Sequence, residues 1–343
     1  MDSDDLFDRL PDEVVRIIFS KLKDARSLCS SMSVCKRFHY IVPQVDDVFI
    51  SIPQKKESDQ ETHRGFKNLV LKTLLKPFQF ISQMIKFKSK NQENDLDFYS
   101  NYVPNEILKS FQGVRSIQLR LPCHVYHKSK RGLKNTTFLK WKAEFGRELH
   151  SCVILGAKSW PRKRQTEEKI EFNDQESRVM SDEELKLRIV WTISCLIAAS
   201  ARHYLIKETV KAQKGLQELV VSDESDQGRL CMNREQIEEM RELKEKSDEM
   251  LEYRSRVPAL RMKMWYLEKL ELPDSGGVME GATVVVIRPA ATGAGGGDGE
   301  GIRSDGDVVA AAFQGEGERK VLCEAVRKLM VAKKCYTLEM NSF

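Results

Sequence analysis

The side chains of this 343-residue chain that could do chemistry are scattered rather than grouped. Cys123, His124 and His127 form the one compact group of possible metal ligands, but a zinc site needs about four ligands and no second pair accompanies them. No paired carboxylates, H-E-x-x-H motif or set of nucleophile, base and orienting group stands out. The glycine-rich stretch 293–299 lacks the G-K-[ST] ending of a phosphate-binding loop. The sequence therefore predicts no catalysis, no cofactor and no bound metal.

Composition is that of an ordinary core-forming protein, with 41% hydrophobic and 31% charged residues. The N-terminal residues MDSDDLFD are acidic and lack the basic and apolar parts of a signal peptide. The longest apolar run, 189–201, contains Thr192 and Ser194 and is shorter than the roughly 18 residues of a membrane span. The eight cysteines form no C-x-x-C pair, which is typical of reduced thiols. We expect a protein of the nucleus or cytoplasm with no membrane partner.

Positive charge is concentrated in the middle of the chain. The net charge is only +5, but residues 55–170 carry 24 basic and 11 acidic side chains. The densest basic clusters are HKSKRGLK (127–134) and PRKR (161–164). Such a region could bind nucleic acid or an acidic substrate, or serve nuclear import, although a solvated surface is the commonest explanation.

An amphipathic helix is predicted near the N-terminus. Pro11 suits the first position of a helix, where its missing N–H costs nothing. Asp12 and Glu13 follow in the first turn, where negative charge complements the helix dipole. Four apolar residues at three- and four-residue spacing then form one face: Val14, Ile17, Ile18 and Leu22.

Two shorter helices are predicted after it. Asp24 is a candidate cap for a helix carrying Leu28, and Ser33 for one carrying Val34, Cys35 and Phe38. Three helices this short cannot bury all of their apolar surface among themselves, and domains below about 40 residues usually need a partner. The pattern predicts a helical module that binds another protein.

The order of these features resembles the F-box, the module that docks a substrate receptor onto the Skp-family adaptor of a cullin-based ubiquitin ligase (SCF). The features are a Leu-Pro-x-Glu start, an apolar stripe, an Asp-led second element and a Val-Cys-Lys-x-Phe close. The resemblance implies that residues 1–45 bind the adaptor and, through it, cullin and RING subunits. Phe38 stands where many family members carry Trp. Nine residues would form the adaptor-binding surface or its support: Leu10, Pro11, Ile17, Ile18, Leu22, Leu28, Val34, Cys35 and Phe38.

Residues 46–343 are predicted to form a second domain of alternating helices and strands. The glycine-rich residues from about 290 to 307 cannot bury apolar surface and are predicted to be a flexible loop. Helices are expected at 66–87, 105–111, 138–149, 181–211, 233–256 and 316–334. Strands are expected at 48–52, 114–121, 152–155, 216–221, 267–272, 283–287 and 336–343.

Several of these strands share the form L-x-x-L-x-L with aliphatic substitutions: VRSIQL, LHSCVI, LQELVV and LEKLEL. They resemble the strands of leucine-rich repeats. Their starts at 114, 149, 216 and 267 are separated by 35, 67 and 51 residues, beyond the 20–29 of a regular repeat. The predicted fold class is therefore α/β, a three-helix F-box followed by a degenerate leucine-rich-repeat-like helix/strand domain.

Four distal stretches resemble the plant auxin-up-regulated F-box group: WKAEFGRELHSCVILGA, EELKLRIVWTISCLIAASARHYL, LEKLELPDSG and YTLEMNSF. This resemblance implies a substrate-recognition subunit of an SCF ligase that presents an unidentified protein for ubiquitination. Such a subunit is not itself an enzyme, because its contribution is proximity and orientation. The first alternative is a nucleic-acid-binding or regulatory protein that uses the basic middle segment, with the F-box controlling its own turnover. The second is a steric scaffold that binds the adaptor without delivering a target.

Overall fold

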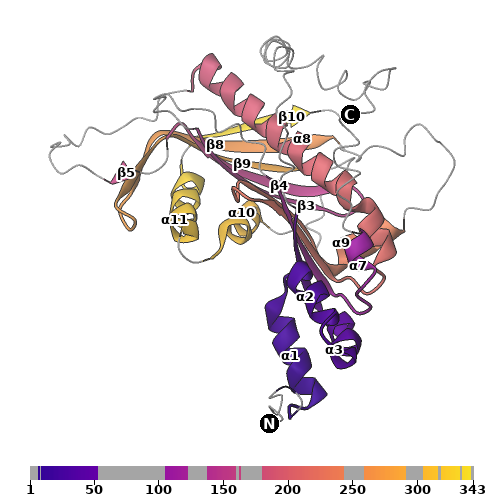
Figure 1. Cartoon of the computed structure of the whole chain (residues 1–343). Coiled ribbons are helices and arrows are strands. Elements are labelled where there is room, and N and C mark those ends of the chain that lie inside the picture. Colours follow the sequence, from indigo (N-terminus) through magenta and orange to yellow (C-terminus); the bar gives the residue numbers. More distant parts are fainter. Residues whose placement is uncertain are drawn as a thin grey trace, which may run out of the picture.

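The computed structural model describes residues 7, 9–52, 105–122, 137–159, 162–163, 180–242, 259–290, 304–315, 318–332 and 334–340. In these residues three short N-terminal helices precede one mixed β-sheet with helices on both faces (Figure 1). The prediction of a helical module followed by a domain of helices and strands is confirmed.

The N-terminal module contains α1 (Asp12–Leu22), α2 (Ala25–Met32), α3 (Lys36–Ile41) and the 3-10 turn η1 (Val42–Gln44). Asp24 caps α2 as predicted, since its Oδ2 accepts a hydrogen bond from the backbone N–H of Ser27 at 2.9 Å. Ser33 does not cap α3, because it still belongs to the end of α2, where its N–H bonds to Ser30. The cap of α3 is Cys35, whose Sγ accepts the N–H of Phe38 at 3.5 Å. Pro11 precedes α1 as its N-cap instead of lying in the first turn.

The sheet has ten strands, and nine of them follow the order β1-β2-β6-β7-β3-β4-β9-β8-β10. β1, β2 and β6 run parallel, as do β7 and β3, and the other neighbours are antiparallel. The short β5 pairs with β9. The bounds are β1 Asp47–Ser51, β2 Ser116–Leu121, β3 Phe138–Phe145, β4 Leu149–Ala157, β5 Arg162–Lys163, β6 Glu218–Asp223, β7 Gly228–Met232, β8 Leu260–Leu272, β9 Gly277–Pro289 and β10 Cys335–Met340.

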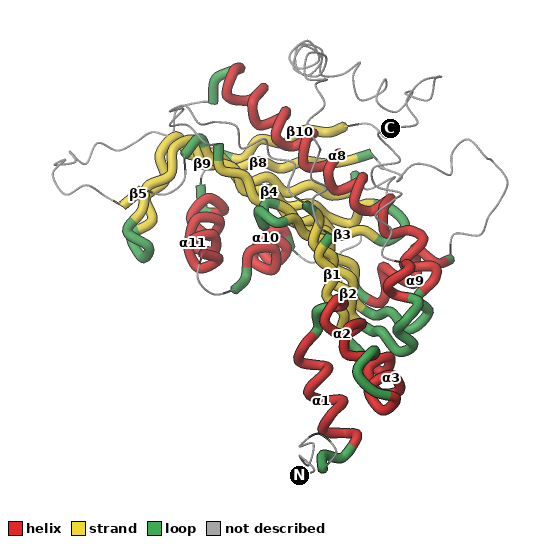
Figure 2. The backbone as a smooth tube through the Cα atoms, viewed as in Figure 1, coloured by secondary structure: helices red, strands yellow, loops and turns green. Residues whose placement is uncertain are grey.

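Helices cover the two faces of the sheet unequally (Figures 1 and 2). The long α8 (Asp182–Ala212) crosses one face, with α7 (Asn105–Leu108) and α9 (Arg234–Arg241) packed beside it. On the other face α10 (Asp305–Phe313) and α11 (Glu318–Met330) pack mainly over β4, β9 and β8 and reach as far as β3. The opposite face of β1, β2, β6 and β7 is therefore left uncovered by the described helices.

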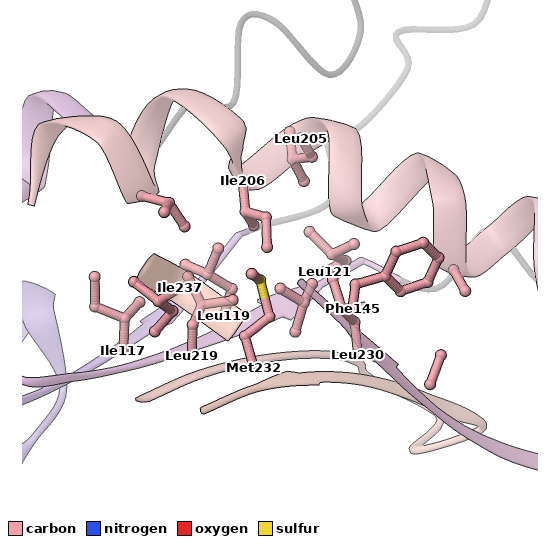
Figure 3. Packing of buried hydrophobic residues seen from close by; sticks show 14 of the residues in the cluster. Ile117, Leu119, Leu121, Phe145, Leu205, Ile206, Leu219, Leu230, Met232 and Ile237 are labelled. Carbon is pink, nitrogen blue, oxygen red and sulfur yellow. The ribbon is translucent and has the colours of Figure 1, made fainter. Parts of the chain in front are cut away.

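The alternation of side chains along the strands fills two cores. On β4, Cys152 and Ile154 face α8, whereas Val153 and Leu155 face α10 and α11, so nearly every residue of this strand is buried. On β2, which is covered on one side only, Ile117 is buried and Gln118 is exposed. Figure 3 shows Ile206 of α8 above the side chains that neighbouring strands contribute: Ile117, Leu119, Leu121, Leu219, Leu230 and Met232.

The N-terminal module is joined to the sheet at β1. The N–H of Phe49 donates to the carbonyl of Lys23 at 2.7 Å, and Asp24 forms a parallel bridge with Phe49. Lys23 has a φ of +53°, which turns the chain sharply after α1, and its Nζ lies 2.9 Å from Asp47 Oδ2. Buried residues of the module lie in the same hydrophobic cluster as the strands: Val15, Phe19, Ala25, Leu28, Ile41, Val42 and Val45. The module and the sheet domain thus share one core.

The segment Phe138 to Leu149, predicted as a helix, forms β3 and the start of β4. Trp141, Phe145 and Leu149 recur every four residues, which suits a helical face. Four is also a multiple of the two-residue period of a strand, so spacing alone does not separate the two structures. The alternation of side chains identifies a strand, because Trp141 and Phe145 are buried on one face while Lys142 lies on the other face.

The strand order contradicts the leucine-rich-repeat-like prediction. In a repeat solenoid each unit packs against the next unit in sequence, so successive repeat strands are neighbours. Of the four L-x-x-L-x-L segments, which fall in β2, β4, β6 and β8, only β2 and β6 are paired. Many buried strands fit the six-residue pattern, so it does not show that successive units pack against one another as repeats.

Other differences concern the ends of elements. The predicted loop at 290–307 includes the start of α10, where Ser304 and Asp307 form a capping box, while residues 291–303 lie outside the described part. The predicted helix 233–256 is described only as α9, since 243–258 lie outside the described residues, as does the predicted helix 66–87. β7 and the first half of β8 were not predicted.

By length and composition alone α8 could cross a membrane. In the fold it is a core helix, with Leu196 and Ile206 in the cluster shared with the sheet. The charged Arg188 is buried beside Trp191 near the start of the helix. Burial explains the apolar residues on its inner side, whereas Ile197 and Tyr204 remain exposed on the outer side.

Candidate partner-binding surface

Helix α1 has two apolar faces, and only one of them packs inward. Val15 and Phe19 are buried in the core, as their four-residue spacing allows. On the other side, Ile17 is 58% exposed and Leu22 is 43% exposed. We define the α1 apolar face as the outward-facing set Val14, Ile17, Ile18 and Leu22.

Exposed large hydrophobic side chains are concentrated in the N-terminal module. Within the described residues there are eleven, and seven of them lie between residues 7 and 40: Phe7, Val14, Ile17, Ile18, Leu22, Val34 and Tyr40. Scattered exposed apolar residues are normal on a protein surface, but a contiguous group marks an interaction site. The group on α1 therefore points to a protein partner.

Two of the nine predicted binding residues lie inside the module. Leu28 of α2 has no exposed surface. The ring of Phe38 on α3 is half-buried and makes edge-on contacts with Phe19, at 5.0 Å between centroids, and with Phe7, at 5.5 Å. Their positions suit support of the surface rather than contact with a partner.

The remaining predicted residues lie at or near the surface. Pro11 is exposed and Leu10 half-buried at the start of α1. Val34, in the turn between α2 and α3, is 70% exposed, and Cys35 is exposed beside it. Sequence analysis missed Tyr40, which is 73% exposed on α3. Its exposure could have been inferred from the sequence, because Phe38 and Ile41 already fill the inward positions of this short helix.

Arg37 of α3 fixes the start of α1. Its Nε donates to Asp12 Oδ1 at 2.8 Å, its Nη1 to the carbonyl of Phe7 at 2.7 Å, and its Nη2 to the carbonyl of Leu10. These charge-assisted hydrogen bonds hold the segment before α1 against α3. The α1 apolar face is therefore presented on a fixed scaffold, which lowers the entropy lost on binding.

Two titratable groups with shifted pKa values, His203 and Asp223, lie in the sheet domain and not on the α1 apolar face. Burial lowers the pKa of His203 on α8 to about 4, opposed by the hydrogen bond of its Nε2 to the Gly146 carbonyl at 2.9 Å. Burial alone would raise the pKa of Asp223, but hydrogen bonds from Ser225 and Gln227 and the charge of Arg202 lower it. Both groups tie loops to the core rather than forming a reactive site.

The described residues contain no cluster of three or more His, Cys, Asp or Glu side chains that could hold a metal ion. The group Cys123, His124 and His127 lies outside these residues, as does the basic cluster 127–134. Of the cluster 161–164 only the strand β5 is described. The α1 apolar face offers no general acid, base or nucleophile among its four side chains; what it can do is exclude water against a complementary surface.

The comparison with protein families bears on this module directly, because residues 7–46 match the F-box-like family. F-box protein AUF1 of Arabidopsis thaliana is 34% identical over 352 residues, covering 99% of this chain and all of the relative. F-box protein At1g30200 of the same plant is 34% identical, covering 99% of this chain and 94% of the relative. The chain belongs to the F-box protein family.

F-box protein AUF2 is a further relative, 32% identical over 351 residues. The resemblance to the auxin-up-regulated F-box group is therefore confirmed, and it extends over the whole chain. No solved structure matches the chain significantly. The residues that match the F-box-like family form the same helices that carry the exposed apolar face.

Proposed function

We propose that this F-box protein is the substrate-recognition subunit of an SCF ubiquitin ligase. Its α1 apolar face would bind a Skp-family adaptor, which links it to cullin and RING subunits, and its sheet domain would bind a target protein. The proposal assigns it no catalytic step. Its contribution is to raise the local concentration of a target lysine near the charged ubiquitin.

The observation that carries the proposal is the exposure of the α1 apolar face in a module of the F-box-like family. Each of its four side chains keeps roughly half of its surface to bury, which is worth roughly 1 kcal/mol per residue. Val34 and Tyr40 add further apolar area on the same module. A partner that covers these side chains would gain the affinity of a specific interface from a small number of residues.

The shared core bears on how the receptor would act. Because α2 and β1 pack together, a protein bound to the module would be held in a fixed relation to the sheet domain. A rigid receptor would hold a bound target at a defined distance from the conjugating enzyme, which favours transfer. We place this activity in the nucleus or cytoplasm.

The test compares the proteins captured in cells of a plant host by the intact chain, by Ile17→Asp/Ile18→Asp and by the control Ile197→Asp. Ile197 lies on α8 and is 41% exposed, as is Ile18. The double variant should lose adaptor and cullin because two carboxylates would be buried without partners. It should retain and accumulate other proteins, which are then candidate targets.

Two outcomes would contradict the proposal. If the double variant still captures adaptor and cullin, the α1 apolar face is not the docking surface. If a reconstituted complex assembles but ubiquitinates none of the retained proteins, the chain is a scaffold without delivery. Steeply salt-dependent capture of nucleic acid in place of proteins would instead favour the basic middle segment.

A further inference from the structure

A pocket of about 200 Å³ lies where α10 and α11 stop covering the sheet. Its walls come from β3, from the turn and first residues of β7, from the end of α10 and from α11. Lys140 and Lys142 face this side because they alternate with the buried Trp141. Beyond β7 the sheet continues over β6 and β2, whose face on this side carries no described helix.

The walls of the pocket are strongly basic. Four cations line it, Lys140, Lys142, Arg229 and Arg319, against one carboxylate, Asp226. Asp226 is already occupied, since its Oδ1 accepts from Arg229 at 2.8 Å and its Oδ2 lies 3.8 Å from the Nζ of Lys140. An excess of positive charge therefore remains in the pocket after internal pairing.

Two of the cations are held in position, Arg319 by a carbonyl and Lys142 by a neighbouring carboxylate. Arg319 donates to the carbonyl of Gln314 at 3.2 Å. Its side chain lies against Gly315, where an added Cβ would come within 2.3 Å of Arg319 Cδ. Lys142 is only 20% exposed and shares its charge with Glu144 at 2.8 Å. Partly buried cations are screened less by salt than exposed ones.

The pocket also has an apolar side. Phe313 of α10 and Leu322 of α11 belong to the core on this face of the sheet and also line the pocket. A volume of about 200 Å³ holds one or two amino-acid side chains. Phe313 and Leu322 are only 4% and 5% exposed, so they form a small apolar floor beside the cations. This combination fits an apolar side chain flanked by carboxylates, which is a feature of peptides and not of a nucleic-acid backbone.

We propose that this basic pocket binds an acidic segment of the target, with an apolar side chain against Phe313 and Leu322 and flanking Asp or Glu carboxylates paired with Lys142 and Arg319. The inference deepens the proposed function, on which it rests, by naming the chemical class of the recognised segment. Single carboxylates suit these sites because each cation is separate and already partly oriented.

The test uses the full-length chain and a phage-displayed library of random dodecapeptides. Selected peptides should carry at least two Asp or Glu residues around an aromatic or aliphatic residue. Their affinity should fall about tenfold for Lys142→Gln/Arg319→Gln and further for Lys142→Glu/Arg319→Glu. The matched control is Lys109→Gln/Arg234→Gln, which removes two exposed cations, one directly after α7 and one on α9. Higher salt should weaken binding to the intact chain.

Adaptor binding, measured on the same proteins, separates this inference from the proposed function. The pocket variants should keep adaptor binding, which also shows that they are folded, and Ile17→Asp/Ile18→Asp should keep peptide binding. Selected peptides without acidic residues, or peptides that bind the pocket variants as well as the intact chain, would overturn the inference. Displacement of the peptides by single-stranded nucleic acid at lower concentration than by free acidic peptide would assign the pocket to nucleic acid and overturn it too.

Discussion

Leu28 and Ile17 are aliphatic residues of the F-box in opposite environments. Leu28 is fully buried between α2 and the rest of the core, whereas Ile17 is 58% exposed on α1. Leu28→Ala should lower the free energy of unfolding by roughly 2–5 kcal/mol, because it removes packed methyl groups and leaves a cavity. Ile17→Ala should change it by less than about 0.5 kcal/mol. Denaturant titration of both variants checks this.

The two substitutions should have the reverse order of effect on adaptor binding. Ile17→Ala should weaken binding under conditions in which the Leu28→Ala variant, kept below its unfolding transition, binds normally. Equal destabilisation by the two variants would mean that α1 packs against the chain and that its apolar face is not free.

His203 should make the stability of the protein depend on pH. Its pKa falls from 6.5 to about 4 on folding, chiefly because burial disfavours the charged ring. Above pH 6.5 the ring is neutral in both states. As the pH falls from 6.5 to 4 only the unfolded state takes up the proton, so stability is lost across this window, by roughly 3 kcal/mol in total.

His203→Gln removes the titrating group while keeping a donor for the Gly146 carbonyl. Its free energy of unfolding, measured by denaturant titration at pH 7 and pH 4, should fall by less than that of the intact chain. His39→Gln, at an exposed position on α3, is the control and should follow the intact chain. Identical pH dependence in the intact chain and in His203→Gln would refute the account of this residue.

For single residues, the sequence indicated which side chains matter better than whether each one is buried or exposed. The outward residues Ile17 and Ile18 were singled out from their spacing, while Val15 and Phe19, which face the core, were not. Both the inward and the outward face of an amphipathic helix show this spacing, so only the fold distinguishes the two faces. The buried Arg188 and His203 flank the apolar run 189–201 of α8, but their partners on β9 and after β3 are distant in sequence.

Helix α8 is attached to the sheet by one buried cation near its start. Arg188 donates to the Gly281 carbonyl at 3.0 Å and to Thr283 Oγ1 at 3.1 Å, and it also pairs with Glu184. Its guanidinium lies over the ring of Tyr266 at 4.9 Å. Gly281 has a φ of +58°, and a Cβ there would lie 2.8 Å from the Arg188 Nη2, so glycine permits this approach.

Arg188→Leu should lower the free energy of unfolding by roughly 1–3 kcal/mol, because it leaves the Gly281 carbonyl without its donor and removes one of the two cations that pair with the half-buried Glu184 carboxylate. Arg188→Lys should recover only part of this loss, since an ammonium cannot reach all the acceptors of the guanidinium fork. Lys186→Leu, at an exposed position of the same helix, is the control. A change below 1 kcal/mol for Arg188→Leu in denaturant titration would show that the cation is dispensable.

Elements with a strong local signal were predicted, and those specified by distant contacts were not. The capping residue Ser181 and the apolar centre of α8 located this helix to within one residue. β3 was taken for a helix because its buried residues recur at a spacing shared by both periods. β7 was not predicted because it begins with a glycine, Gly228, which is uncommon in strands. The glycine is required there because the indole ring of Trp141 packs against its Cα, and a Cβ would come within 2.0 Å of that ring.

At the scale of the whole molecule, the F-box and the sheet domain are one folding unit in their packing. Val15, Phe19 and Leu28 share a cluster with Val48 and Ile50 of β1. A fragment of residues 1–46 would lose the strand side of this core and is near the size at which a domain needs a partner. By circular dichroism it should show no cooperative thermal transition alone and should gain helicity with the adaptor. A sharp transition in the isolated fragment would mean that the module folds independently.

The strand order lay beyond sequence reasoning for a physical reason. Neighbours such as β2 and β6, or β4 and β9, are separated by at least a hundred residues, and their pairing is set by which buried faces fit together. The prediction of repeats was therefore wrong, because four aliphatic segments can be similar in sequence without being neighbours in the sheet. The F-box was predictable because its helices, caps and apolar stripe are contiguous in the chain.

The central claim is that the α1 apolar face docks a Skp-family adaptor. The most direct measurement is a calorimetric titration of the full-length chain with that adaptor, repeated with Ile17→Asp/Ile18→Asp and with Ile197→Asp. We predict one-to-one binding by the intact chain and by Ile197→Asp, and an affinity at least about 100-fold weaker for the double variant, because it buries unpaired carboxylates. Absence of binding by the intact chain, or equal binding by all three proteins, would contradict the account.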